Sequence, residues 1–558
     1  MIRISSYANN ILNQNYIKMK KLVLTLIFLI AIHSVAQNVQ SIEFHNQKLE
    51  RGNRYMKSNL YQKDFLLFID MLKNTHPAFT KQIVPPFNID SLERKGYMEL
   101  KNCKSNQAFK FFVQRQISLL HDGHTTINLN IPQQDELYYM YNLSYTKEGY
   151  LLRAVDKSYP EALGKLVVKI NNKTTDEFIQ LFSQYISSDN EVALRARILG
   201  TQQLNHFALV SRLPYARKDS LLILTLNDGS SIKLHPIKPD RTKIEVFKPH
   251  IETINPISIR EKSHMPFLYK IDQKHDIVYL QFNSCEDQYT QRWMVKERGI
   301  ELTEEQEKRL SAIPYFHETL RKMFAEVKEK GIETVVIDVR QNGGGNSILC
   351  TELMSWLYPI VKESKFNPQY KTISVGARFS PLFEQVYPKM AQEVEDQCKS
   401  ANRGKIDYAT LYNDAWKPLN LKNLSTLSQT KEITSKTLPL LNTNSDSIFK
   451  GKVVFIQDEQ TFSSAAILIL EAHDNHIGRV IGGESEYNTS NFGDVLMWRL
   501  PNTQIEGSVS FKMFLRPDLN CFNEKLLVPT PMIIPTVADL LSGNDPCWQW
   551  IIENYGKQ

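Results

Sequence analysis

The chain has 558 residues, of which 42% are hydrophobic, and a formal net charge of +7. At about 150 residues per unit, this length predicts three or four folding units. Four basic residues and no acidic ones lie in the first 36 positions, so the remaining chain carries 7 − 4 = +3. Its basic residues form no cluster with interleaved aromatics, which argues against a nucleic-acid-binding or membrane-surface protein.

Residues 1–36 predict an upstream extension followed by a signal peptide. A basic start at residues 19–21 precedes an apolar run over 22–32 and the small-residue cleavage site Ser34-Val35-Ala36. The apolar run is too short to predict a membrane span, and no cysteine stands at the cleavage point to carry a lipid. We therefore expect an exported, periplasmic or extracellular protein whose mature form begins at Gln37.

Amphipathic helices are predicted between Tyr61 and Leu120, and they lead into residues 121–125, His-Asp-Gly-His-Thr. Polar and apolar residues alternate from Thr126 onward, so a strand should follow. His124 would then lie at a helix-to-strand corner. His121 and His124 have the spacing of half a metal site, but no third ligand stands near them, so we expect no metal.

A β-rich unit is predicted next, from about Tyr138 to Lys238. Strand patterns occur at 149–152, 166–170 and 220–226, with a helix starting at Thr175. The V-V-x-I-N-x-K pattern of residues 167–173 looks PDZ-like. PDZ domains bind extended peptide ends by strand addition, but a β-rich spacer explains the pattern equally well.

The last large unit starts near residues 277–282, a buried strand pattern. A second apolar strand, 334–340, runs into the consecutive glycines 343–345, which a helical pattern follows at once. Glycines permit positive φ and a close backbone approach, as an anion-binding loop requires. The loop lacks the endings of a P-loop or a dinucleotide fingerprint, so we expect no nucleotide site.

Ser463 stands between a buried strand pattern at 453–456 and an apolar helix that begins at Ala465. A nucleophile suits such a sharp turn, because the free N–H groups at a helix N-terminus can hold an oxyanion. The alternative is that Thr461 or Ser463 merely caps the helix.

Together the three motifs resemble the tail-specific, or C-terminal processing, serine peptidases, and more closely their tricorn-core-like branch. The family patterns D-G-H-T, D-L-R-x-N-x-G-G and T-x-S-[SA]-[AG]-E correspond here to residues 122–125, 338–345 and 461–466. They follow one another in the family's order, and the resemblance extends from about Tyr61 to about Trp548.

The resemblance implies a Ser/His/Glu triad of Ser463, His124 and Glu524, because residues 484–490 contain no lysine for a Ser/Lys pair. His124 would take the serine proton, Glu524 would orient the imidazole, and the backbone N–H groups of Gly344 and Ser464 would bind the oxyanion. The rival carboxylates for the third role are Glu484, Glu486 and Asp494.

Two residues depart from the family patterns, namely Ala466 in place of a glutamate and Thr530 in place of an aspartate. They allow an alternative class, a catalytically inactive relative that binds a peptide or an apolar ligand. A third possibility, a small-substrate esterase, lacks the G-x-S-x-G elbow.

The sequence thus predicts a multidomain α/β serine endopeptidase that acts on polypeptides without metal or organic cofactor. We expect a helical domain at 37–137, a PDZ-like domain at 138–245 and a mixed α/β catalytic domain at 246–558. The catalytic domain should have the crotonase-like sheet of tail-specific proteases, interrupted by a polar insertion at 362–450.

Overall fold

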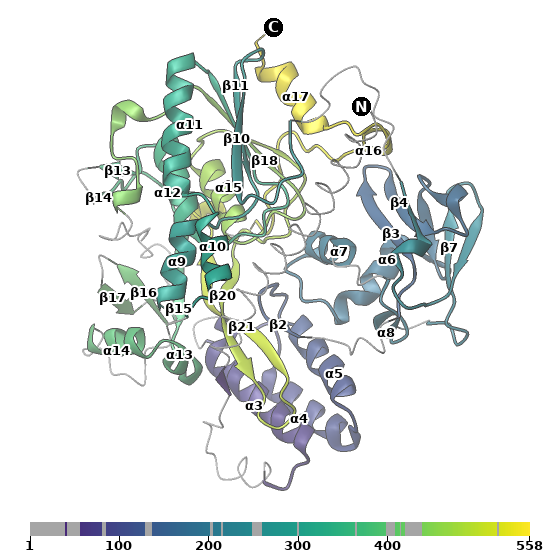
Figure 1. The fold of residues 1–558 in the computed structure, drawn as a ribbon. Coiled ribbons are helices and arrows are strands. Elements are labelled where there is room, and N and C mark those ends of the chain that lie inside the picture. Colours follow the sequence, from purple (N-terminus) through teal and green to yellow (C-terminus); the bar gives the residue numbers. More distant parts are fainter. Residues whose placement is uncertain are drawn as a thin grey trace.

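The fold is seen in a computed structural model that describes residues 40–41, 56–80, 85–128, 137–200, 205–213, 216–247, 259–297, 301–362, 365–397, 408–412, 415–418, 438–521 and 524–557. The predicted extension and signal peptide lie outside these residues. The chain has a mixed α/β, multidomain fold, as the sequence predicts (Figure 1).

The sheet of the predicted catalytic domain has the strand order β10-β11-β12-β18-β19. Its strands are β10 (Phe267–Asp272), β11 (Ile277–Phe282), β12 (Thr334–Asp338), β18 (Lys452–Gln457) and β19 (Arg479–Gly482). From β11 to β19 neighbouring strands run parallel. Parallel strands are usually covered on both faces, and β11 and β12 are accordingly buried along their whole length.

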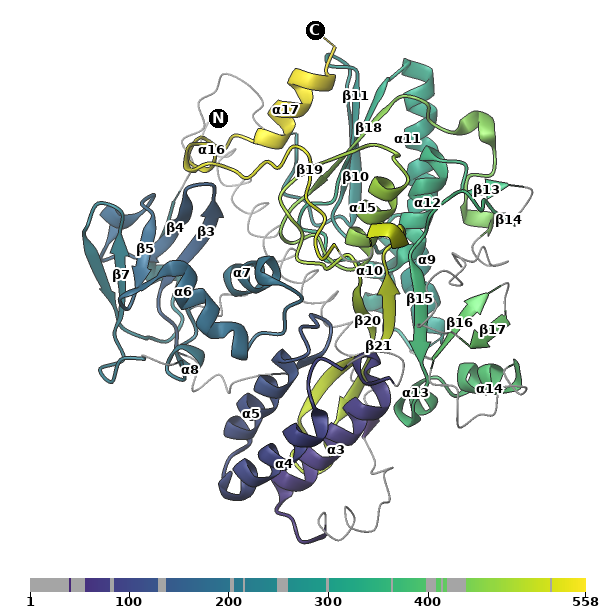
Figure 2. The same cartoon turned by 180° about the vertical axis from the view of Figure 1, so that it is seen from behind.

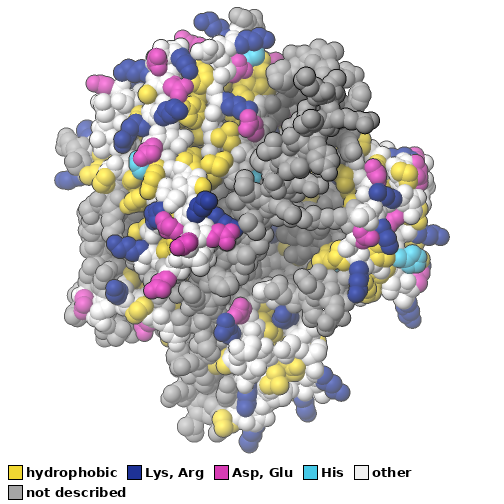
Figure 3. Space-filling model, in the orientation of Figure 1, with side chains coloured by type: hydrophobic (Ala, Val, Ile, Leu, Met, Phe, Trp, Pro, Cys, Tyr) yellow, Lys and Arg dark blue, Asp and Glu magenta, His cyan; other side chains and the backbone are white. Residues whose placement is uncertain are grey.

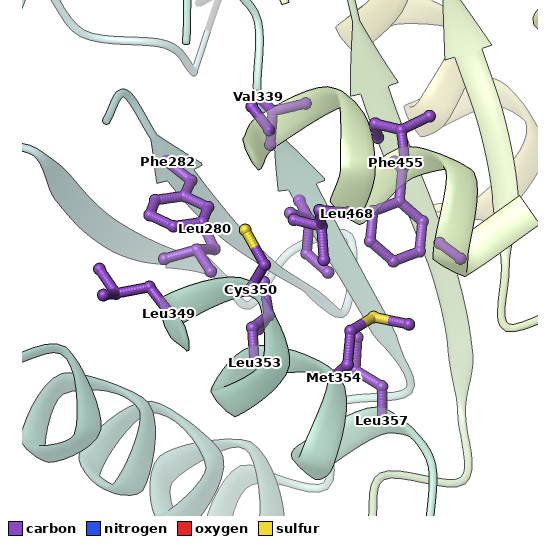
Figure 4. Close-up of a cluster of buried hydrophobic side chains, with 14 of the residues drawn as sticks. Leu280, Phe282, Val339, Leu349, Cys350, Leu353, Met354, Leu357, Phe455 and Leu468 are labelled. Atoms are coloured by element: carbon purple, nitrogen blue, oxygen red, sulfur yellow. The ribbon is translucent and has the colours of Figure 1, made fainter. Parts of the chain in front are cut away.

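Helices cover both faces of this sheet. The helices α11 (Phe316–Lys330), α12 (Ser347–Leu357) and α15 (Ser464–Asp474) pack on one face, and α17 (Pro546–Tyr555) packs on the other. Figure 4 shows Leu280 and Phe282 of β11 and Phe455 of β18 packed against side chains of α12 and α15. The two turns predicted to hold the nucleophile and the glycine loop each begin one of these core helices.

The N-terminal helices are α3 (Leu60–Thr75), α4 (Ile89–Glu99) and α5 (Asn106–Ser118). They pack onto a hairpin far along the chain, formed by β20 (Asn491–Arg499) and β21 (Glu506–Leu515), with which they share a hydrophobic core (Figure 1). The rings of Phe68 and Trp498 lie 5.7 Å apart within it. The helical part of the chain is thus built around a hairpin that the C-terminal part supplies.

The hairpin belongs to a sheet with the order β1-β20-β21-β15-β16-β17, in which β2 (Thr126–Ile127) also pairs with β21. Its other strands are β1 (Gln40–Ser41), β15 (Ser374–Arg378), β16 (Tyr408–Tyr412) and β17 (Ala415–Pro418). The predicted insertion, 362–450, therefore contributes β15, β16 and β17 to this sheet, together with α13 (Pro381–Val386) and α14 (Pro388–Gln397).

The PDZ-like part has its own core and two small sheets. One sheet contains β3 (Tyr141–Thr146), β4 (Gly149–Asp156) and β9 (Ile244–Val246), and the other contains β6 (Lys173–Thr174), β5 (Val167–Ile170), β7 (Leu222–Leu226) and β8 (Ser231–Leu234). Helices α6 (Thr175–Gln180), α7 (Glu191–Gly200) and α8 (Phe207–Val210) accompany them. Figure 2 shows α7 on the side of this unit that faces the rest of the molecule.

The remaining described α-helices and strands are α9 (Gln288–Glu297), α10 (Glu304–Ser311), β13 (Val361–Lys362), β14 (Lys365–Phe366) and α16 (Val537–Ser542).

On the face of the molecule shown in Figure 3, the coloured basic and acidic side chains are interspersed. Within the described ranges, no helix combines the length and the apolar character that crossing a membrane requires. The residue boundaries of the predicted domains stay a prediction.

Candidate active site

Ser463 stands at the turn from β18 into α15, as its flanking patterns predict. Its backbone angles are φ 51° and ψ −126°, a conformation that L-residues rarely adopt and that costs about 1–3 kcal/mol. Its side chain makes no capping hydrogen bond to α15. The capping alternative therefore does not account for Ser463, whereas a strained turn that exposes the hydroxyl is typical of a nucleophile.

The glycine loop comes within van der Waals contact of this turn. Gly344 has φ +98°, and a Cβ built there would lie 2.6 Å from Ser463 Cβ and 2.9 Å from Ser464 N. A hydrogen bond from Ser464 Oγ to the Gly345 carbonyl oxygen, 2.7 Å, holds the loop to α15. Only a residue without a side chain fits at Gly344, so the glycines serve the close approach that the sequence predicts.

The two predicted oxyanion donors differ in this structure. The backbone N–H of Ser464 makes no hydrogen bond within the described part of the chain, which leaves it available at the N-terminus of α15. The N–H of Gly344, in contrast, donates to Asn342 Oδ1 at 2.9 Å. Gly344 can serve as the second donor only if that bond breaks. Of the two predicted oxyanion donors, the N–H of Ser464 is therefore available and that of Gly344 is not.

His124 lies on the corner between α5 and β2 and meets Ser463 across a sequence separation of 339 residues, with His124 Nε2 3.3 Å from Ser463 Oγ. Its ring stacks on Phe462, with centroids 4.5 Å apart and planes 28° apart. The hydroxyl of Ser508 on β21 donates to the His124 carbonyl oxygen at 2.7 Å. The structure thus joins the first two predicted site residues in one hydrogen bond.

Glu524 does not join this pair. Its carboxylate accepts a 2.6 Å hydrogen bond from the Arg516 guanidinium, its side chain is 60% exposed, and no contact among the described residues links it to His124. The structure thus holds Glu524 against Arg516, a buried cation that attracts this carboxylate, and not against the imidazole, and its role in a triad stays a prediction.

Two of the three rival carboxylates, Glu486 and Asp494, are also engaged elsewhere. Glu486 accepts a 2.8 Å bond from Arg197 Nε, and burial raises the pKa of its carboxyl against the charge of that arginine. Asp494 pairs with Lys512 at 2.6 Å. Within the described residues, the carboxylate nearest the ring is that of Asp122, whose Oδ1 lies 3.8 Å from His124 Nδ1.

The PDZ-like unit holds the histidine loop by its backbone, a feature that no motif signals. Gly123 N–H donates to Asp189 Oδ1 at 2.6 Å, and Arg197 Nη1 donates to the Gly123 carbonyl oxygen at 2.8 Å. Burial and then the neighbouring Asp122 carboxylate raise the pKa of Asp189 to about 6. These residues lie in a stretch without periodic or motif signals, so sequence reasoning missed them.

The two departures from the family patterns lie outside the Ser463–His124 contact. Ala466 lies within α15 and is buried in the main core, and the Thr530 N–H donates to the Val480 carbonyl oxygen at 3.0 Å. His121 is exposed with φ 48°. Nowhere in the described ranges do three or more His, Cys, Asp or Glu side chains gather as metal ligands would.

Comparison with known proteins finds a family match for part of the chain. Residues 309–530, which contain the glycine loop and Ser463, match the family model described as peptidase family S41. A comparison with curated proteins finds no match.

Solved structures of CPAF are similar in fold. Mature CPAF complexed with lactacystin has a TM-score of 0.56 at 13% identity, covering 88% of this chain and 97% of that chain. A mutant of CPAF gives 0.57 at 12% identity, covering 89% and 98%. Mature CPAF alone gives 0.54 at 14% identity, covering 88% and 95%. At these identities the likeness shows the fold alone, and together with the match of residues 309–530 to peptidase family S41 it supports a serine-type peptidase.

Proposed function

We propose that this chain is an exported endopeptidase in which Ser463 is the nucleophile and His124 is the general base. The observation that carries the proposal is the 3.3 Å contact between Ser463 Oγ and His124 Nε2 at a strained turn into α15. A base within hydrogen-bond reach of a serine hydroxyl is the geometry of covalent catalysis, and such contacts are often loose before substrate binds.

The chemistry follows from these positions. Ser463 Oγ bonds to the carbonyl carbon of the scissile peptide while its proton passes to His124 Nε2. The Ser464 N–H, at the positive end of α15, stabilises the oxyanion, and a glycine-loop N–H adds a second bond once Asn342 releases it. The C–N bond then breaks, His124 protonates the leaving amine, and water hydrolyses the acyl-serine by the same steps in reverse.

Glu524 would complete the predicted triad only if its carboxylate left Arg516. Export rests on the sequence of residues 19–36 alone, and N-terminal sequencing of the secreted protein should find Gln37 first. Secreted material that retained Met19 would contradict this part of the proposal.

A fluorophosphonate probe tests the nucleophile. The probe should label the wild-type protein at Ser463, and Ser463→Ala should abolish both labelling and peptide hydrolysis. Ser211→Ala, which removes an exposed hydroxyl outside the site, is the matched control and should be labelled like the wild type. A wild-type protein that neither reacts with the probe nor hydrolyses peptides at any pH would favour the inactive, ligand-binding alternative.

A further inference from the structure

One ring nitrogen of His124 is not accounted for by the contact with Ser463. Its Nε2 faces Ser463, but its Nδ1 is buried and has no hydrogen-bond partner among the described residues. An unpaired buried polar atom is costly, and it points to a group that approaches during the reaction. Among the described residues, Asp122 has the one carboxylate within 4.0 Å of this ring, with Oδ1 3.8 Å from Nδ1.

Asp122 is itself firmly held. Its side chain is fully buried, and its Oδ2 accepts hydrogen bonds from Thr125 Oγ1 at 2.5 Å and from His76 Nε2 at 3.0 Å. Its Oδ1 accepts from the backbone N–H of His124 at 2.9 Å. Burial alone would raise the pKa of Asp122, but the neighbouring side chains of His124 and His76 hold it well below its usual range.

The hydrogen bonds of His76 define its protonation state. Its Nδ1 accepts from the backbone N–H of Ala78 at 3.1 Å, so Nδ1 carries no proton and Nε2–H must donate to Asp122. His76 is completely buried, and its ring packs edge-on against Phe492 with centroids 4.8 Å apart. A histidine whose Nε2–H donates therefore supports the carboxylate at Oδ2, whereas His124 Nδ1 lies nearest Oδ1.

We propose that Asp122 takes the place of the third triad member, orienting His124 and stabilising its imidazolium, and that His76 is a positioning residue that acts through Asp122. The inference deepens the proposed function and rests on it. Closing the Nδ1–Oδ1 gap from 3.8 Å to hydrogen-bond length needs a shift of about 1 Å, as expected when an apo site tightens on substrate. Asp122 is buried and near the ring, whereas Glu524 is exposed and bound to Arg516.

The first test compares Asp122→Asn with Glu524→Gln by kcat and KM on one peptide substrate. Asp122→Asn should lower kcat about 10³–10⁴-fold with KM nearly unchanged, because the amide keeps the shape but not the charge that stabilises imidazolium. Glu524→Gln should keep kcat within about threefold, and Asp446→Asn is an exposed control. The reverse ranking of Asp122→Asn and Glu524→Gln would overturn the inference and return the role to Glu524.

The acid limb of the pH–rate profile is a second measurement on Asp122→Asn. If Asp122 only stabilised the fold, its substitution would not shift this limb along the pH axis. Loss of the Asp122 charge should shift that limb to lower pH, since imidazolium is then less stable. The other charged groups around the loop, Asp189, Glu486 and Arg197, are unchanged in this variant. An unshifted limb together with wild-type kcat would refute the assignment.

The second test uses His76, so that the inference stays testable even if Asp122→Asn does not fold. His76→Gln keeps an N–H donor near Asp122, whereas His76→Phe keeps a ring without one. The Gln variant should retain most of kcat and the Phe variant should lose about 10–100-fold, and equal kcat values would contradict the positioning role. If Ser463 reacts with the probe and His124→Ala is inactive while all these variants behave as wild type, only this inference fails. If Ser463 never reacts, the proposed function itself fails.

Discussion

The two halves of the candidate site are built in different ways. Ser463 lies where a core strand turns into a core helix, and β18 and α15 fix it by local geometry. His124 lies at the meeting of separate parts of the chain, with Ser508 of β21 on one side and Asp189 and Arg197 of the PDZ-like part on the other. The proposed nucleophile is thus a local feature of its sheet, whereas the position of the proposed base depends on long-range packing.

This difference indicates which changes should damage the site. Variants on the Ser463 side should act through the turn between β18 and α15. We expect each of them either to abolish catalysis or to leave it intact. Variants on the His124 side should act by displacing a loop that β21 and the PDZ-like part both hold, with graded effects.

The largest expected effect comes from removing either member of the pair. His124→Ala should lower kcat/KM about as much as Ser463→Ala, by about 10⁴-fold or more, because groups that act as one unit lose function together. EDTA should leave the activity of the wild type unchanged. Inhibition by the chelator, or an active His124→Ala, would show that the base lies elsewhere.

The next effect tests the close approach of the glycine loop. Gly344→Ala places a Cβ 2.6 Å from Ser463 Cβ at φ +98°, so it should lower kcat about 10²–10³-fold. Gly343→Ala is a matched control, because a Cβ there meets nothing within 4 Å. Equal kcat values for the two variants would mean that the loop does not take part in catalysis.

A smaller effect is expected on the base side. A Cβ at Gly123 would lie 2.4 Å from Arg197 Nη2, so Gly123→Ala should displace the histidine loop and lower kcat about 10–100-fold. The double variant with Arg197→Ala relieves that clash, and it should recover part of the loss. Steady-state kinetics of the two single variants and the double variant measure this coupling, and strictly additive losses would argue against it.

The smallest effect is a pH dependence of stability at the same loop. The pKa of Asp189 is raised to about 6, above the ordinary value of about 3.9, so between these values the folded protein holds a proton that the unfolded chain has lost. Stability therefore falls as pH rises through this window, and the loss is complete above pH 6.

Asp189→Asn should remove that loss while its Oδ1 still accepts from Gly123 N–H. Thermal melts should show the variant gaining a few degrees in Tm over the wild type at pH 7.5 and little at pH 4. A Tm difference that does not change with pH would contradict the raised pKa.

Local signals in the sequence were sufficient for the mixed α/β fold, the strained turn at Ser463 and the close glycine loop. In each case a buried strand pattern runs directly into a helix pattern, so neighbouring residues determine the geometry. The motif order also identified the family, which the match over residues 309–530 confirms. The same signals led to His124, although its contact with Ser463 spans 339 residues.

Tertiary structure alone decided the partners of that histidine. Sequence cannot show that Arg516 binds Glu524, that Asn342 takes the Gly344 N–H, or that His76 reaches Asp122. It also gave no sign that the helices around Phe68 pack on the β20–β21 hairpin. Hydrogen bonds and ion pairs between distant segments leave no period or spacing in a chain, because they depend on how whole elements pack, and here that packing determines which carboxylate lies nearest His124.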